Sequence, residues 1–187
     1  MITEKNVRLP CLLLPVLAQT LLVPTSSVAE IIPYKESDVE ILSDVPAWFL
    51  GMLSWRGIQM PIAILEKMEP YLSWDGIVGQ QSELHKQCYI AVINRVTKIN
   101  SNIVVQKFRQ YPFFSIIVQG TPKLIRVSHK SLSISDTAKL ADPRLIMEVK
   151  VEEHVAFVPN LDSVWKIIDT LPARLQWLGK IVQRNGG

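Results

Sequence analysis

The sequence predicts a mainly β protein with a helical C-terminus. Short segments rich in Val, Ile and Phe recur about every ten residues, a spacing typical of barrels or sandwiches rather than βαβ units. Hydrophobic residues make up 48% of the 187 residues and charged residues 20%, which excludes a disordered chain. We therefore expect one domain, or two small subdomains that share a core.

The uncharged run 9–29 contains two apolar segments separated by a polar step, Gln19-Thr20. The run is long enough to span a bilayer, and residues 27–29 are similar to a signal-peptide cleavage site. Three prolines interrupt it, however, and helices tolerate interior proline poorly. The pattern favours two short buried strands and a turn.

The remaining strands are expected between turn residues. Arg56-Gly57 predicts a turn between two apolar segments, and the interior Pro61 predicts that the second of them is an edge strand or carries a bulge. Glu152-Glu153 predicts a solvated turn near the C-terminus. The expected strands are 48–55, 58–65, 89–96, 102–108, 113–118, 124–127, 145–151 and 155–158.

The apolar period changes to that of a helix after residue 160. Asn160 or Asp162 is suited to cap this helix, and Pro172 ends it or begins the next one. Its expected buried face consists of Leu161, Val164, Trp165 and Ile168. We expect 161–187 to form a C-terminal helical segment, whose last part packs inward or binds a partner or membrane surface.

No residue pattern points to catalysis, a cofactor or a metal site. The nucleotide-binding, α/β-hydrolase and zinc-protease motifs are absent, and the three histidines are scattered. Ser163 and Lys166 match S-x-x-K, but the partner motifs of that chemistry are missing, so Ser163 is expected to help start the helix. Cys11 and Cys88 are expected to be buried free thiols, which fits a reducing, cytoplasmic compartment.

Charge is distributed unevenly along the chain. The first 70 residues carry five basic and eight acidic residues, and the rest carry fifteen and nine. No acidic residue occurs between Leu84 and Ser135. An alternative function is therefore a small β-barrel that binds nucleic acid or an anionic surface through residues 86–130 and the last helix. The other interpretation of the same segment is a solvated basic sheet face, which would also suit an acidic protein partner.

Residues 28–65 are the most distinctive part of the sequence. Arg56 lies between apolar residues and a glycine, where its guanidinium is costly to desolvate without a partner. It is suited either to an interface rich in carboxylates and carbonyls or to an internal cap on a turn carbonyl. The motifs in order are Val28-x-Glu30-Ile31, Val45-Pro46, Gly51-x-x-x-Trp55-Arg56-Gly57 and Met60-Pro61.

These motifs resemble those of the CheW-like adaptors, the coupling proteins of bacterial chemosensory arrays. The Trp-Arg-Gly form, with Trp48 and Trp55, is similar to the ChpC-type accessory adaptors of type IV pilus (twitching motility) systems. The resemblance implies a single domain over 1–187, made of two small five-stranded β-barrels around a shared core. It implies a non-enzymatic signalling scaffold in the cytoplasm, recruited to membrane-associated receptor arrays, with no cofactor and no small-molecule substrate.

The expected partners are the regulatory domain of a CheA-type histidine kinase, the cytoplasmic tips of methyl-accepting chemoreceptors and other CheW-like proteins. The resemblance places a receptor groove at Val28, Glu30 and Arg56, with the two glycines shaping the loop that presents the arginine. The expected protein-interaction residues are Val28, Glu30, Ile31, Gly51, Trp55, Arg56 and Gly57.

Two positions depart from the family pattern. Many members carry Asp in the strand after the Arg-Gly turn, where this chain has Ile64, and the usual V-D-x-V reads Val118-Gln119-Gly120-Thr121 here. The loss of both carboxylates favours a specialised adaptor over the main coupling protein.

Overall fold

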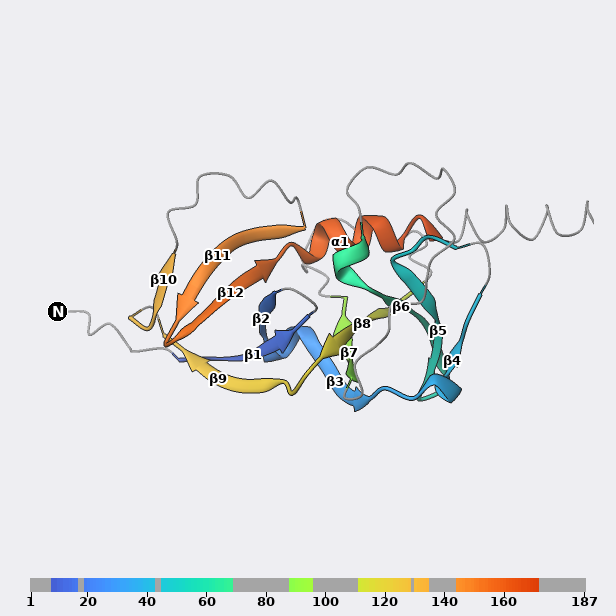
Figure 1. Cartoon of the computed structure of the whole chain (residues 1–187), viewed down its shortest axis with the longest axis horizontal. Coiled ribbons are helices and arrows are strands. Elements are labelled where there is room, and N and C mark those ends of the chain that lie inside the picture. The colour runs from blue at the N-terminus through green and yellow to red at the C-terminus, as the bar shows by residue number, and fades with distance from the viewer. Residues whose placement is uncertain are drawn as a thin grey trace, which may run out of the picture.

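Two antiparallel-rich β-sheets of six strands each form the protein in the computed structural model (Figure 1). A short helix, α1, follows the last strand near the C-terminal end of the described chain. The structure describes residues 8–16, 19–42, 45–68, 88–95, 111–128, 130–134 and 144–171. The mainly β class, the two subdomains and the C-terminal helix are as the sequence predicted.

The first sheet joins the two ends of the chain, in the order β10-β11-β12-β2-β1-β9. β1 and β2 form an antiparallel hairpin in which Cys11 pairs with Pro24, so the uncharged N-terminal run is a pair of buried strands, as expected. The strands are β1 (Leu9–Pro15), β2 (Thr20–Pro24), β9 (Lys123–Val127), β10 (Leu132–Ile134), β11 (Leu145–Val151) and β12 (His154–Pro159).

The second sheet is built from the middle of the chain, in the order β3-β7-β8-β6-β5-β4. Its edges are β3 on one side and the two-residue β4 on the other. The strands are β3 (Val28–Pro33), β4 (Val39–Glu40), β5 (Phe49–Trp55), β6 (Ile58–Ala63), β7 (Cys88–Asn94) and β8 (Phe113–Gln119). Short 3₁₀ turns occur at Thr25–Ser27, Glu36–Asp38 and Leu65–Lys67.

Among the described residues each sheet has six strands, one more than the five that the family resemblance implied. The additional strands are short: β4 and β10 pair only with β5 and β11, respectively, at the edges of their sheets. Such short segments leave no alternating pattern for sequence reasoning to detect. The expected strand at 102–108 lies outside the described residues.

Pro61 lies in an interior strand, so the edge-strand alternative of the prediction was wrong, whereas the bulge alternative fits the irregularity in the pairing of β6 with β5 beside this residue. β6 has β5 on one side and β8 on the other. Proline is tolerated because the parallel pairing with β8 involves only Ile62 and Ala63, beyond the residue that lacks an N–H. The carbonyl of Pro61 in turn accepts a hydrogen bond from the buried Ser115 hydroxyl, at 3.1 Å.

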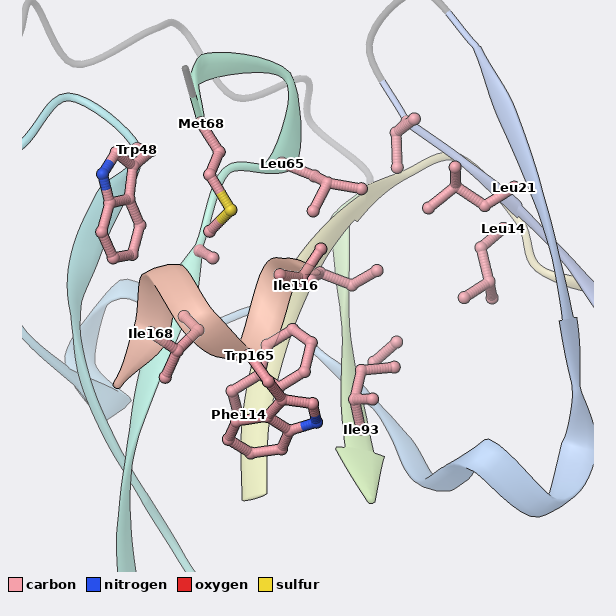
Figure 2. Close-up of a cluster of buried hydrophobic side chains, with 14 of the residues drawn as sticks. Leu14, Leu21, Trp48, Leu65, Met68, Ile93, Phe114, Ile116, Trp165 and Ile168 are labelled. Atoms are coloured by element: carbon pink, nitrogen blue, oxygen red, sulfur yellow. The ribbon is translucent and has the colours of Figure 1, made fainter. Parts of the chain in front are cut away.

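A shared hydrophobic core joins the two sheets to α1 (Leu161–Ile168) (Figure 2). Leu14 and Leu21 enter it from the first sheet, and Ile93 and Phe114 enter it from the second. Trp165 of α1 packs edge-on against Phe114, with ring centroids 4.6 Å apart. Each sheet also has an apolar cluster of its own. The two subdomains therefore pack around a common core.

The helix begins where the sequence predicted. The Asn160 side chain accepts a hydrogen bond from the N–H of Ser163, at 3.2 Å, which makes Asn160 the N-cap. Ser163 thus belongs to the start of a helix, as expected. Residues 172–187, which complete the predicted C-terminal segment, lie outside the described residues. No helix among the described residues has the length and hydropathy that a membrane crossing requires.

Candidate protein-interaction site

The hairpin of β5 and β6 ends in a two-residue turn made by Arg56 and Gly57. Trp55 pairs with Ile58 across it, and the φ angles of Arg56 and Gly57 are 51° and 78°. Positive φ at both positions is the geometry of a type I′ turn, in which Asn-Gly is the preferred pair. Glycine adopts this conformation freely, whereas for an L-residue such as arginine it costs about 1–2 kcal/mol.

The side chains beside this turn converge on one carboxylate. Oε2 of Glu30 accepts a hydrogen bond from the indole Nε1–H of Trp55 at 2.7 Å, and Nη2 of Arg56 lies 3.1 Å from the same oxygen. The guanidinium also lies over the Trp55 ring, 5.0 Å from its centroid. The opposing charges and the cation–π contact hold the arginine against the tryptophan. We call Glu30, Trp55 and Arg56 the carboxylate cluster.

The carboxylate cluster also shows how far the second sheet curves. Glu30 belongs to β3, at one edge of the sheet, and Trp55 belongs to β5, which is next to the other edge. The hydrogen bond between them therefore joins strands that three others separate in the pairing order β3-β7-β8-β6-β5. The sheet closes on itself at this end, as a barrel does.

Arg56 is the exposed member of the cluster. Its side chain is 69% exposed, whereas that of Glu30 is 34% exposed and Trp55 is half-buried. Within the described residues, Arg56 donates to no backbone carbonyl, which is the contact that an internal cap requires. A guanidinium has five N–H donors, and Glu30 engages it through one nitrogen, Nη2. The others are available to acceptors on a partner.

The other predicted site residues lie apart from the turn. Val28 and Ile31 are half-buried in β3 and pack against the shared core. Gly51 lies inside β5, where an added Cβ would come within 2.4 Å of the carbonyl oxygen of Glu40 in β4. Gly51 thus permits the close approach of β4, whereas Gly57 shapes the turn itself.

Phe113 is a member of the site that sequence reasoning did not assign to it. Its ring packs edge-on against Trp55, with centroids 5.2 Å apart and an interplanar angle of 69°. Trp55 therefore contacts Phe113, Arg56 and Glu30. The only sequence signal was an aromatic residue at the start of an expected strand, which does not identify its neighbour in a distant hairpin.

Two further arginines bind groups distant in sequence. Arg95, 7% exposed, forms an ion pair with Asp169, and its guanidinium lies 4.0 Å from the centroid of the Trp165 ring. It also donates to the carbonyl oxygen of Tyr111 at 3.2 Å, so it fastens the end of β7 to α1. Arg144, just before β11, donates to the carbonyl oxygens of Leu65 and Met68, which follow β6. Arg95 thus joins the second sheet to the helix, and Arg144 joins the first sheet to the second.

The aromatic residues that the structure describes in the basic segment are not arranged for nucleic-acid binding. Tyr111 and Phe114 are buried in the shared core, and burial raises the pKa of the Tyr111 hydroxyl above its ordinary value. Stacking on bases requires exposed rings. Phe108 lies outside the described residues. The exposed cations of β9, Lys123 and Arg126, accompany no exposed aromatic ring among the described residues.

Both cysteines are buried thiols outside any disulfide, as the sequence predicted. Burial raises the pKa of the Cys11 and Cys88 thiols, so both are protonated near neutral pH. A nucleophilic thiol needs the opposite shift and an exposed position. The described residues hold no group of three or more His, Cys, Asp or Glu side chains that could bind a metal ion.

Comparison with known families fits this architecture. A family model described as the CheW-like domain matches residues 10–169. The chain belongs to the CheW-like domain family. The match includes both sheets, the carboxylate cluster and α1. No curated protein sequence matches the chain significantly.

A solved structure shares the fold. The scaffolding protein TtCheW from Thermoanaerobacter tengcongensis superimposes with a TM-score of 0.51. The alignment includes 82% of this chain and 90% of that one, at 14% sequence identity. At that identity the likeness concerns the fold, and the properties of individual side chains must be argued from this chain.

Proposed function

We propose that the protein is a non-enzymatic signalling adaptor that couples chemoreceptors to a CheA-type histidine kinase. Membership of the CheW-like domain family supports this class of function, and the fold of a CheW scaffolding protein agrees with it. The single observation that carries the proposal is the conformation of Arg56. A charged side chain is kept on a strained turn and 69% exposed, where it contributes little to the core.

Strain of this kind supports an inference from structure to function. A non-glycine residue in the left-handed region persists only where its surroundings fix it, and such residues gather at functional sites. Asparagine would satisfy the turn better, so stability alone does not explain arginine here. The partner surface that fits is one rich in carbonyl or carboxylate oxygens, because guanidinium presents fixed planar donors. The receptor tip and the kinase regulatory domain are the proposed partners, together with other CheW-like proteins.

The finer proposal is a specialised adaptor of the ChpC type, which acts in the cytoplasm in the control of type IV pilus motility. The Trp-Arg-Gly turn supports it, because the Trp55 side chain contacts both Glu30 and Arg56 in the carboxylate cluster. Ile64 supports it as well: it is buried in the apolar cluster of the second sheet, so this position presents no carboxylate to a partner. We further propose that 1–187 acts as one domain.

The test is binding of the purified chain to the regulatory domain of a CheA-type kinase and to a receptor-tip fragment from the same cell. Arg56→Asn removes the guanidinium and keeps a residue that the turn accepts. The matched control is Arg126→Gln, which removes an exposed arginine from β9 in the other sheet. We expect the wild type and the control to bind and Arg56→Asn to lose at least one partner. Failure of the folded wild type to bind either one would contradict the adaptor role.

The same pair of variants tests the alternative of an anionic ligand. Binding through the basic segment would weaken steeply with salt and would suffer from Arg126→Gln. Adaptor binding through Arg56 would show a shallow dependence, because Glu30 already neutralises the guanidinium. Stronger loss with Arg126→Gln than with Arg56→Asn would favour the anionic ligand.

A further inference from the structure

Trp55 contacts three other side chains near the turn, those of Glu30, Arg56 and Phe113. Its ring contacts both the Arg56 guanidinium and the Phe113 ring, at distances of 5.0 and 5.2 Å from its centroid. Its N–H is bonded to Glu30 at 2.7 Å, on the oxygen that also pairs with Arg56. One side chain thus supplies a platform for the guanidinium and orients the carboxylate that holds it.

We infer that Trp55 is a positioning residue, which fixes Arg56 in its binding conformation before a partner arrives. The inference rests on the proposed function, because it gives Trp55, already expected at that interaction site, a defined role there. Arg56 alone has a long, flexible side chain that is 69% exposed, and free rotation would spread its donors over many directions. The platform and the shared carboxylate restrict that rotation in the free protein.

Pre-orientation affects affinity because a partner need not immobilise the side chain itself. Ordering one rotamer-rich side chain at an interface weakens binding by up to about tenfold. The indole N–H is essential to the arrangement, since it accounts for one of the two donors on Oε2 of Glu30. A phenylalanine at this position would keep a ring beside Phe113 and lose that donor.

The charge of the cluster defines the chemistry that it recognises. Glu30 and Arg56 together carry no net charge, so the site offers directed N–H donors rather than a positive field. It suits a surface of main-chain carbonyls or a carboxylate in fixed geometry, which guanidinium binds through parallel donors. A lysine, with one mobile ammonium group, does not reproduce this geometry.

The test compares the wild type with Trp55→Phe and with a matched control, Trp48→Phe. The control also loses an indole N–H, but from a buried residue of the shared core whose Nε1 finds no hydrogen-bond partner in the described part of the chain. ¹⁵N relaxation of the Arg56 side-chain Nε–H measures its order in the free protein. Titration of the kinase regulatory domain and the receptor tip then measures affinity. A general loss of stability moves neither readout in a folded sample.

We expect an Arg56 order parameter above about 0.8 in the wild type and in the control, and below about 0.6 in Trp55→Phe. We expect Trp55→Phe to weaken binding by up to about tenfold. Equally low order parameters of the Arg56 side chain in the free wild type and in free Trp55→Phe would overturn the inference, and this measurement requires no partner. Unchanged affinity in Trp55→Phe, beside a loss in Arg56→Asn, would overturn it and leave the adaptor role intact. If the order parameters agree with these expectations but the wild type binds neither partner, the adaptor role is contradicted and the positioning of Arg56 by Trp55 is not.

Discussion

Replacing Arg56 by asparagine separates the backbone strain of the turn from the side-chain contacts that offset it. Relief of the left-handed conformation is worth about 1 kcal/mol, since arginine costs about 1–2 kcal/mol there and asparagine less. The lost contacts are an exposed ion pair, worth about 0.2–1 kcal/mol, and a cation–π contact, worth about 0.5–1 kcal/mol. The relief of strain and the loss of contacts nearly cancel, so the free energy of unfolding of Arg56→Asn should lie within about 1 kcal/mol of the wild-type value.

The backbone strain at Arg56 can be measured separately once the contacts of Arg56 with Glu30 and Trp55 have been removed. In a Glu30→Gln/Trp55→Leu background, Arg56 has neither its ion pair nor its ring, so only the strain remains. There we expect Arg56→Asn to stabilise the protein by about 1 kcal/mol. The difference between the two backgrounds is a coupling energy of about 1 kcal/mol, which is typical of residues in direct contact.

Urea unfolding of the four proteins, followed by circular dichroism, measures this cycle. An effect of about 1 kcal/mol shifts the melting temperature by about 2–4 °C in a chain of this size, which gives a second readout. Equal effects of Arg56→Asn in both backgrounds would refute the view that the carboxylate cluster offsets the strain. A loss above about 2 kcal/mol in the wild-type background would instead show that Arg56 is an internal cap.

Three further predictions concern the fold that presents the cluster. Gly51→Ala should destabilise the protein by about 2 kcal/mol in urea unfolding, because the new Cβ meets the Glu40 carbonyl oxygen at 2.4 Å; a neutral effect would mean that β4 is free to move. Arg95→Met should cost about 2 kcal/mol, because the ion pair with Asp169 and a backbone hydrogen bond are lost; stability equal to wild type would show that packing alone holds α1. Burial favours the neutral hydroxyl of Tyr111 and raises its pKa in the folded state above the ordinary value of 10.0. The free energy of unfolding should therefore fall as the pH rises from 10.0 through the folded-state pKa. Tyr111→Phe should reduce this alkaline loss of stability, and an unchanged pH profile in the variant would contradict the prediction.

Much of the fold could be predicted because the chain follows local rules. The N-terminal apolar run pairs as a hairpin, since its prolines exclude a long helix. Asn160 caps α1, because its side chain reaches an N–H of the first turn. The turn at Arg56-Gly57 also lies where expected. For Pro61 only the edge-strand alternative was wrong, because the pairing partners of a strand depend on tertiary arrangement, which local composition does not encode.

The site was predictable only in part. The family pattern supplied Glu30, Trp55 and Arg56 as interaction residues, and these three converge in the structure. Their sharing of one carboxylate oxygen depends on the closure of the second sheet, which brings β3 to β5. Phe113 joins them from a strand far along the chain. Spacing along a sequence carries no information about such long-range contacts.

The uneven charge of the sequence has little bearing on the carboxylate cluster. The acidic first 70 residues and the basic remainder do not correspond to the two sheets, because the chain contributes β1 and β2 to the same sheet as β9–β12. Arg95, a buried arginine of the acid-free segment, is paired with Asp169 and holds α1 against the core. At the cluster itself, Glu30 cancels the charge of Arg56. Under the proposed function, recognition at the cluster depends on the direction of the Arg56 N–H donors, which is the property that we infer Trp55 to control.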